Sequence, residues 1–484
     1  MRNRRFRSWR VTLPLAVSVL LCGCAMLLDL DSYLPVAGDA VDSSSTEVSS
    51  SDTSTPTGDG GACVVVESDR LDGVIDLALG RNHTCALKGD GQVYCWGDNS
   101  FGQLGIQQVQ TISTSLPQSV SFPKELGTAR ISKLFAGVYT TFALDSERRL
   151  WAWGWNAAGL LAIGSTDDLA HTVPAFIRTN AVPGADALRV RTMTVTRQSA
   201  CALTATGDIL CWGTNIEGTM GQSPPAPLLD SGSFVPVKAF DAPLIPPGPN
   251  ALFAQTVNSS ALCYAAGVEF SGLKCWGRGN SFQLLLLTDY TDAAEINAMA
   301  GAALINAGLR TPFKKVVLGR FFGAALDASG RVAIWGGFGP AYPIGGSIEA
   351  GVASELSAST DAGKDGNWTD ITSGSEHLCL LDGARRVRCM GRNDQLALGR
   401  PPIDSSIPQD YDTPDYAVRS ADGVPLERAQ SVYAGLYHSC AVVDGSCDSG
   451  MGGQVACWGD GDYGKLGNGL TAHSFAAVGV KPAK

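Results

Sequence analysis

Charged residues are scarce in this chain of 484 residues: Asp, Glu, Lys and Arg make up 17% of it, and the formal net charge is −10. Proteins that bind nucleic acid usually carry a basic patch or a high isoelectric point, so this balance argues against such a partner. Histidine is rarer still, with five residues. The sequence also lacks a phosphate-cradling glycine loop, a nucleophile elbow and a His-Glu-x-x-His motif, so it predicts neither an enzyme nor a cofactor.

The sequence also lacks an apolar run long enough to span a bilayer comfortably. Its N-terminal apolar run, VTLPLAVSVLLCG, is too short for this. It follows an arginine-rich start and is typical of an export signal. The run ends in Leu21-Cys22-Gly23-Cys24, which resembles a bacterial lipobox. We therefore expect residues 1–23 to be a lipoprotein signal peptide and Cys24 to be lipidated. Cys22 is the alternative acceptor, and a simple secretory peptide is the alternative interpretation.

Residues 24–62 contain few large apolar side chains after position 37 and are rich in Ser, Thr, Asp and Gly. Such a segment cannot bury a core, so we expect a disordered linker. Ala25 follows the lipobox cysteine, and within lipoproteins this resemblance implies the outer membrane. The expected location is therefore outside the cytoplasm, at the bacterial outer membrane or cell surface, with membrane contact through the lipid anchor only.

The segment TCALKGDGQVYCWGDNSFGQLG, at 84–105, has six relatives further along the chain. Each unit reads as a hairpin that ends in Trp-Gly or a variant of it, and the segments between units supply further strands. About four strands per unit and a period near 60 residues predict an all-β, seven-bladed propeller over residues 63–484. The aligned positions are Cys85, Phe142, Cys201, Cys263, Ala324, Cys379 and Cys440.

Two segments compete to close the predicted ring: SFAAVGVKPAK at the C-terminus and CVVVES at 63–68. The first resembles a strand between repeats, so we expect it to pack beside the first blade. Residues 292–309 break the β pattern and predict a short helix in an insertion.

Ten cysteines fall into five pairs, one pair within each of five repeats. The two repeats without cysteine lack both members, with Phe142 facing Ala152 and Ala324 facing Ile334. This joint absence predicts disulfides across the hairpins, because opposed residues of an antiparallel pair lie within disulfide reach. Zinc is the rival interpretation, but the spacing differs from the usual Cys-x₂₋₄-Cys. The predicted pairs are Cys85 with Cys95, Cys201 with Cys211, Cys263 with Cys275, Cys379 with Cys389, and Cys440 with Cys457.

Two further cysteines, Cys63 and Cys447, lie near the two ends of the folded region. A bond between them would join the first and last blades, and we expect this bond as a sixth disulfide.

The motif Gly-x-x-His-x-Cys-Ala-Leu, followed by Cys-Trp-Gly-x-Asn-x-x-Gly-Gln-Leu-Gly, resembles the regulator of chromosome condensation repeat family. The fourth, fifth and sixth units depart from it, with Met390 where Trp is usual. The resemblance implies a seven-bladed propeller. It leaves the function open, because relatives act as nucleotide-exchange factors, as inhibitors of secreted enzymes or as interaction scaffolds.

The histidines have an ordinary structural explanation. His83, His377 and His438 share one repeat position, which carries Phe322 in another unit, so we expect structural histidines there. The other two, His171 and His473, stand alone and are expected to be solvated.

The acids that follow Trp-Gly are likewise expected to be solvated loop residues. Asp98, Asp460 and Asp462 lack the order of a calcium loop. A glycosidase would instead need two carboxyls across a cleft, which the sequence cannot place.

Tryptophan precedes glycine in six units, and this repetition favours packing between blades. Trp151 and Trp155 are additional to the pattern and are candidate partner contacts, with Tyr139 and Phe338 as further members of an aromatic face. The sequence thus predicts a non-enzymatic protein-binding scaffold. An inhibitor of a secreted enzyme is the alternative, and guanyl-nucleotide exchange is a third hypothesis that the export signal and the acidic charge oppose.

Overall fold

The computed structural model describes the compact unit Ala62–Lys484 from residue 69 to residue 482. The other unit, Met1–Gly61, lies outside the described residues. Within the described range, placement is given for all positions except 108–110, 164–166, 168, 179–186, 216–217, 221–234, 237–251, 257–258, 260, 266–272, 278–308, 310–311, 340–341, 344–352, 357–366, 402–416 and 445–451.

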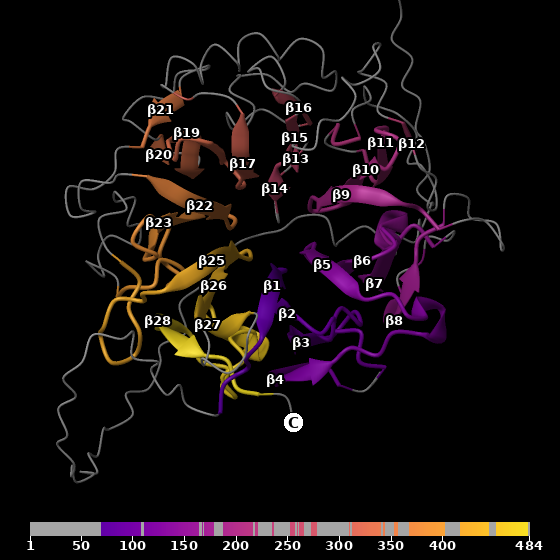
Figure 1. The fold of residues 1–484 in the computed structure, drawn as a ribbon, viewed down its shortest axis with the longest axis horizontal. Coiled ribbons are helices and arrows are strands. Elements are labelled where there is room, and N and C mark those ends of the chain that lie inside the picture. Colours follow the sequence, from indigo (N-terminus) through magenta and orange to yellow (C-terminus); the bar gives the residue numbers. More distant parts are fainter. Residues whose placement is uncertain are drawn as a thin grey trace, which may run out of the picture. The chain divides into compact units, whose positions relative to one another are not determined.

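The strands form seven blades of mostly antiparallel sheet around a common centre, as Figure 1 shows. The first three blades have four strands each. Their strands are β1 (Val74–Leu79), β2 (His83–Lys88), β3 (Val93–Asp98), β4 (Ser113–Ser119), β5 (Ile131–Ala136), β6 (Thr140–Asp145), β7 (Leu150–Trp155), β8 (Ala170–Phe176), β9 (Val190–Val195), β10 (Ser199–Thr204), β11 (Ile209–Gly213) and β12 (Val235–Pro236).

The last four blades follow the same order from the centre outward. The fourth and fifth contain β13 (Leu252–Phe253), β14 (Gln255–Thr256), β15 (Ala261–Ala265), β16 (Leu273–Gly277), β17 (Phe313–Leu318), β18 (Phe322–Asp327), β19 (Val332–Gly339), β20 (Tyr342–Pro343) and β21 (Ala353–Glu355). The sixth and seventh contain β22 (Trp368–Ser373), β23 (His377–Asp382), β24 (Val387–Gly391), β25 (Ala429–Ala434), β26 (His438–Asp444), β27 (Gly453–Gly459) and β28 (Ser474–Gly479).

The predicted seven-bladed propeller is therefore confirmed. Among the described residues the only helical segments are short 3₁₀ turns at Lys124–Leu126, Ala157–Gly159 and Asp462–Gly464. None of the described helical segments is long and apolar enough to cross a membrane. The helix predicted at 292–309 falls on residues of which only Leu309 is described, so that prediction lies outside the described residues.

Five disulfides cross the central hairpins of their blades, at the five pairs that the sequence predicts. Each pair consists of register partners on adjacent strands, with Cα atoms 4.0–4.1 Å apart. The bonds join Cys85 to Cys95, Cys201 to Cys211, Cys263 to Cys275, Cys379 to Cys389, and Cys440 to Cys457.

The two repeats without cysteine keep the same register. Phe142 is opposite Ala152 and Ala324 is opposite Ile334, as predicted. The separation of 17 residues between Cys440 and Cys457 leaves them opposed as well, because their hairpin is longer. The disulfide position is therefore a fixed place in the blade, whether or not cysteine occupies it.

Tryptophan joins neighbouring blades by a repeated hydrogen bond, as its position in the repeat predicts. In five blades the indole Nε1 donates to a backbone carbonyl in the loop of the preceding blade. The bonds run from Trp96 to Lys465 (2.8 Å), Trp153 to Gln103 (2.9 Å), Trp212 to Leu160 (2.8 Å), Trp276 to Thr219 (2.8 Å) and Trp458 to Ala397 (2.9 Å). These five indoles are fully buried, so the core lies between the blades.

The ring closes between the seventh and first blades with the bond from Trp96 to Lys465, which is the same kind of bond as at four other joints, and with a pairing of β1 to β27 at Val74 and Gly453. The strand β28 pairs with β27 and completes its own blade. The residue after β28, Val480, accepts a hydrogen bond from the Leu71 amide at 2.8 Å and packs with Leu71 and Trp96. The C-terminal segment thus contacts the first blade as predicted, and the competing segment 63–68 lies outside the described residues.

Candidate binding surface

Three of the five histidines are buried and bond across blade boundaries. Each imidazole Nε2 lies within hydrogen-bond distance of a hydroxyl oxygen in the next blade. That hydroxyl belongs to the residue directly after the position equivalent to the histidine. The pairs are His83 with Thr141 (3.0 Å), His377 with Ser439 (2.9 Å) and His438 with Thr84 (2.8 Å). The predicted structural role of these histidines is confirmed.

The hydrogen-bond geometry fixes the protonation of two of these histidines. Thr141 Oγ1 donates its only proton to the carbonyl of Gln103, and Thr84 Oγ1 donates to that of Lys465. The imidazoles of His83 and His438 must therefore donate through Nε2, and their Nδ1 atoms have no partner among the described residues. A proton on Nδ1 would be buried without an acceptor, and burial lowers the pKa of His83 to about 3.

A glycine three residues before each of these histidines is required by close packing. At Gly80 an added Cβ would lie 2.1 Å from His83 Cε1, so any other residue would collide with the ring. The fifth blade uses the same arrangement with a different ring, because a Cβ at Gly319 would lie 2.1 Å from Phe322 Cε1. This packing explains the Gly-x-x-His spacing of the repeat.

A buried lysine stabilises the joint between the last and first blades. Lys465 is fully buried, and its ammonium donates to Asn82 Oδ1 at 2.8 Å and to a carboxylate oxygen of Asp460. Asp460 also accepts from the Asp462 amide at 2.9 Å. Burial by itself would raise the pKa of Asp460, but hydrogen bonds from His473 and Lys465 and the Lys465 charge lower it.

The expectation of solvated loop acids is wrong for two of the three residues. Asp98 and Asp460 are buried, and Asp98 accepts from the Ser100 amide and hydroxyl, because both carboxylates order the turn after Trp-Gly. Only Asp462 of the three is exposed. Asp460, Asp462 and His473 lie close enough to share a cation, but the Lys465 ammonium already supplies a positive charge to Asp460. These residues therefore do not make a convincing metal site.

The two remaining histidines are partly exposed and paired with acids rather than simply solvated. His171 Nε2 is 2.9 Å from Asp167 Oδ1, and His473 Nδ1 is 3.1 Å from Asp460 Oδ1. The Asp460 hydrogen bond raises the pKa of His473.

Three aromatic rings from the first two blades form a half-buried cluster, which we call the aromatic patch. Phe101 lies in the loop after β3, Tyr139 in the turn before β6, and Trp155 at the end of β7. Their ring centroids are 5.0–5.7 Å apart. The Arg81 guanidinium lies 6.0 Å from the Tyr139 centroid. The Trp155 Nε1 has no hydrogen-bond partner among the described residues.

The aromatic patch contains two predicted contact residues, Tyr139 and Trp155, and adds Phe101, which sequence reasoning missed. The signal for Phe101 was its place in the variable loop after Trp-Gly. The prediction of a partner contact is wrong for the other candidate, Trp151. Its side chain is fully buried, and its indole Nε1 donates to Asp145 Oδ2 at 2.9 Å. Its ring packs edge-on under Phe122 and Phe176, so it cannot meet a partner.

Several predicted residues lie outside the described residues: Cys24, Cys63 and Cys447, together with the side chain of Phe338. Lipidation and the sixth disulfide therefore stay predictions.

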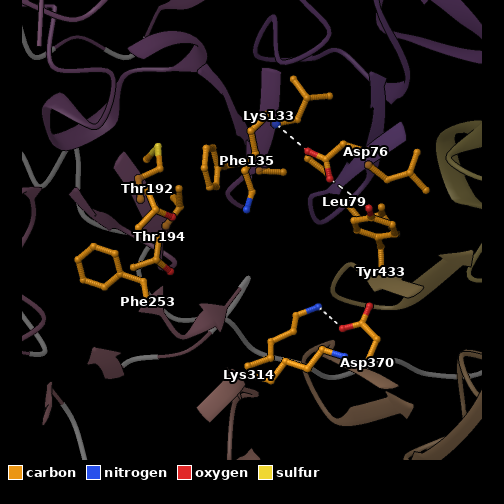
Figure 2. A pocket seen from close by; sticks show the side chains of 17 residues that line it. Asp76, Leu79, Lys133, Phe135, Thr192, Thr194, Phe253, Lys314, Asp370 and Tyr433 are labelled. Atoms are coloured by element: carbon orange, nitrogen blue, oxygen red, sulfur yellow. Dashed lines mark hydrogen bonds and ion pairs between the residues drawn. The ribbon is translucent and has the colours of Figure 1, made fainter. Parts of the chain in front are cut away.

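A cavity of about 330 Å³ lies at the centre of the ring and is lined by residues of the inner strands. Figure 2 shows Asp76, Asp370 and Tyr433 on one side of it and Phe135, Thr192 and Phe253 on the other.

The cavity thus holds two carboxylates, but both already have partners. Asp76 Oδ1 accepts from the Tyr433 hydroxyl at 3.1 Å, and Asp370 Oδ1 lies 2.9 Å from Lys315 Nζ. The cavity therefore offers charged groups that could bind a ligand. Its described lining does not present two free carboxyls facing each other, which a glycosidase would need.

Comparison with known proteins agrees with the repeat pattern. Residues 74–103 and 90–144 match models described as Regulator of chromosome condensation (RCC1) repeat. The chain is 30% identical to the ultraviolet-B receptor UVR8 of Arabidopsis thaliana over 156 residues, which are 31% of this chain and 32% of that protein. The chain spans about a third or less of the length of the curated relatives that it matches.

Solved structures share the fold. Human WBSCR16 superposes with a TM-score of 0.58 at 17% identity, over 78% of this chain and 89% of that chain. Prp20p of Saccharomyces cerevisiae, described with its binding properties to Gsp1p and histones, gives 0.55 at 18% identity, over 85% and 90%. At these identities the likeness concerns the fold alone. Together these findings support the resemblance to the RCC1 repeat family, which the first blade carries most clearly.

Proposed function

We propose that this protein is a non-enzymatic protein-binding scaffold held at the bacterial cell envelope by a lipid on Cys24. Its binding surface is the aromatic patch with Arg81 beside it. RCC1-like propellers include protein-binding members, and the proposal extends that role to this chain. Nucleic acid is not proposed as a partner because the chain is acidic.

The aromatic patch is the observation that carries the proposal. Aromatic and arginine side chains supply much of the binding energy at protein interfaces, and loops on a rigid frame usually carry recognition. Here two neighbouring blades hold the rings within 6 Å of one another. The Trp155 Nε1 is buried and has no hydrogen-bond partner among the described residues, so ring contacts with Phe101 and Tyr139 hold this side chain, whereas Trp153 is held by a hydrogen bond to a backbone carbonyl.

The location rests on different observations. Five cross-hairpin disulfides need an oxidising compartment to persist, which favours export. The lipobox-like Leu21-Cys22-Gly23-Cys24 supplies the anchor. Radiolabelled palmitate offered to cells that express the full chain tests this part. We expect labelling that Cys24→Ala abolishes and Cys22→Ala leaves intact, and labelling that survives Cys24→Ala would refute the assignment.

A binding experiment tests the scaffold itself. The full chain is crosslinked to its neighbours on the envelope, and a captured partner is then titrated against purified variants. Truncating one central aromatic anchor should weaken binding by about tenfold or more, so Trp155→Ala and Tyr139→Ala should both do so. Phe475→Ala is the matched control, because this ring is 47% exposed on β28, outside the aromatic patch. Equal loss in all three variants would contradict the proposal.

Inhibition of a secreted enzyme is the second candidate, and the same aromatic patch favours it, because a partner enzyme would be bound through these rings. It is distinguished by assaying whether the captured partner is an enzyme whose activity falls on binding. Guanyl-nucleotide exchange is disfavoured, because a small GTPase is cytosolic while the paired cysteines indicate export.

A further inference from the structure

The inner strands share a bulge that directs one side chain each toward the centre of the ring. In β1, β5, β9, β17, β22 and β25 the pairing register shifts between the first and third residues. Bulges of this kind re-aim a side chain. The third residues are Asp76, Lys133, Thr192, Lys315, Asp370 and Ser431. The first five of them line the central cavity.

The charges at this position are arranged by sign around the ring. The two aspartates belong to the first and sixth blades, so they flank the seventh blade, which contributes Tyr433. Both carboxylates lie close enough to Tyr433 that they add to burial in raising the pKa of its hydroxyl. The two lysines belong to the second and fifth blades and flank the third and fourth. The acidic positions therefore flank the seventh blade and the basic positions flank the third and fourth, and Lys315 contacts Asp370 where the two sets meet.

The two lysines are not equivalent. Lys315 forms an ion pair with Asp370 at 2.9 Å. Lys133 makes no ion pair within 4.0 Å in the described part of the chain, and its ammonium lies 5.6 Å from the Phe135 ring centroid. Its charge partly offsets the effect of burial on Asp76, whose pKa is raised overall. The cavity therefore has a cation able to bind a further anion.

The wall between the charged positions is partly apolar. Phe135, Met193 and Phe253 line the cavity there together with Thr192 and Thr194, and Figure 2 labels the two phenylalanines and the two threonines. A volume of about 330 Å³ lies at the lower end of the range of small-molecule sites. Such a site fits a compact ligand with an apolar body and few polar groups.

We propose that this cavity binds a small zwitterion with an apolar side group, of the amino-acid class. The ligand's anionic group would meet Lys133, its cationic group would meet the carboxylates of Asp76 and Asp370 around Tyr433, and its side group would pack against the aromatic wall. This site is independent of the aromatic patch, so its failure would leave the proposed scaffold function untouched.

Calorimetric titration of the full chain tests this inference with three related probes. They are phenylalanine, its amide, which keeps only the cation, and 3-phenylpropionate, which keeps only the anion. We expect phenylalanine to bind at least about tenfold tighter than either analogue, because a charge-assisted hydrogen bond is lost with each deletion. Equal affinity for the three probes, or no heat from any of them at about 10 mM, would overturn the proposal.

Two substitutions assign the ends of the ligand. Lys133→Met should weaken phenylalanine and 3-phenylpropionate by about tenfold and leave the amide unchanged, whereas Asp370→Asn should weaken phenylalanine and the amide. Lys124→Met is the control, because it removes one exposed lysine outside the cavity. Tryptophan fluorescence of each variant reports whether the fold is retained. Binding that survives both cavity substitutions in folded protein would refute the site.

Discussion

The histidine of the sixth blade makes stability depend on pH, and the chain itself suggests a variant that removes the effect. In the fifth blade the equivalent position is Phe322, packed over Gly319. The next blade has apolar Leu378 at the position where Ser439 stands in the seventh blade. The double substitution His377→Phe with Ser439→Ala copies this apolar arrangement into the next joint. It removes the titrating ring and its hydroxyl partner together, so neither member of the pair is left buried without the other.

The magnitude follows from linkage. Burial lowers the pKa of His377 from its ordinary value of 6.5 to about 4. Between these two pH values His377 is protonated in the unfolded chain and neutral in the folded protein. The free energy of unfolding therefore falls as pH falls. The loss begins near pH 6.5 and amounts to roughly 3 kcal/mol for this one group by pH 4. The double variant should therefore lose about 3 kcal/mol less than the parent between pH 7 and pH 4.

Urea unfolding with the disulfides intact, followed by tryptophan fluorescence at pH 7, 5 and 4, measures this difference. Other groups titrate in both proteins, so the comparison uses the difference between parent and variant at each pH. His171→Gln is the control, because it also removes one histidine but at the surface, where its partner is Asp167. If the double variant loses as much stability as the parent on acidification, His377 is not the protonated group and the reasoning fails.

Three further changes test the joints and disulfides by the same unfolding assay. Replacing Cys85 and Cys95 together by alanine should cost about 2–3 kcal/mol, because their bond closes a loop of 10 residues in sequence, and an unchanged midpoint would contradict this. Trp96→Phe should cost about 1 kcal/mol through the lost hydrogen bond to Lys465, and a neutral result would refute the bond. Lys465→Met should cost about 3–5 kcal/mol because it leaves the Asp460 carboxylate buried without its ammonium, and a smaller loss after adding Asp460→Asn would support the pairing.

The architecture could be predicted from the sequence because each repeat reports on the others. Cys85 alone could have been a metal ligand or a core residue. Compared with Phe142 and Ala324, it is identified as half of a disulfide, and the register bears this out. The tryptophans are assigned to blade contacts by the same comparison. Repetition turns one ambiguous local signal into several independent observations of the same geometry.

Properties that depend on contacts between blades were harder to predict. The pairing of each histidine with a hydroxyl in the next blade is present in the sequence as a correlation between repeats. His83, His377 and His438 precede units that carry Thr141, Ser439 and Thr84. The correlation becomes meaningful only when the blade order is known.

Trp151 and Trp155 illustrate the limit along one strand. They are four residues apart and look alike in sequence, yet one is fully buried and the other half-buried. Trp151 lies where Phe122 and Phe176 cover it, and Trp155 lies at the strand end. What covers a side chain is set by long-range packing, which a single sequence does not state.

The joint between Lys465 and Trp96 is made from the same indole-to-carbonyl bond as four other joints, and β28 completes the last blade from within its own repeat. The joint that closes the ring therefore uses the same kind of bond as joints in its middle, and the pairing of β1 with β27 adds to it. A gene for such a protein could be cut between two blades and rejoined end to end, and the joints of the ring would still have their partners. For the same reason, blades can diverge one at a time under selection, since each joint depends on two neighbours and on nothing further round the circle.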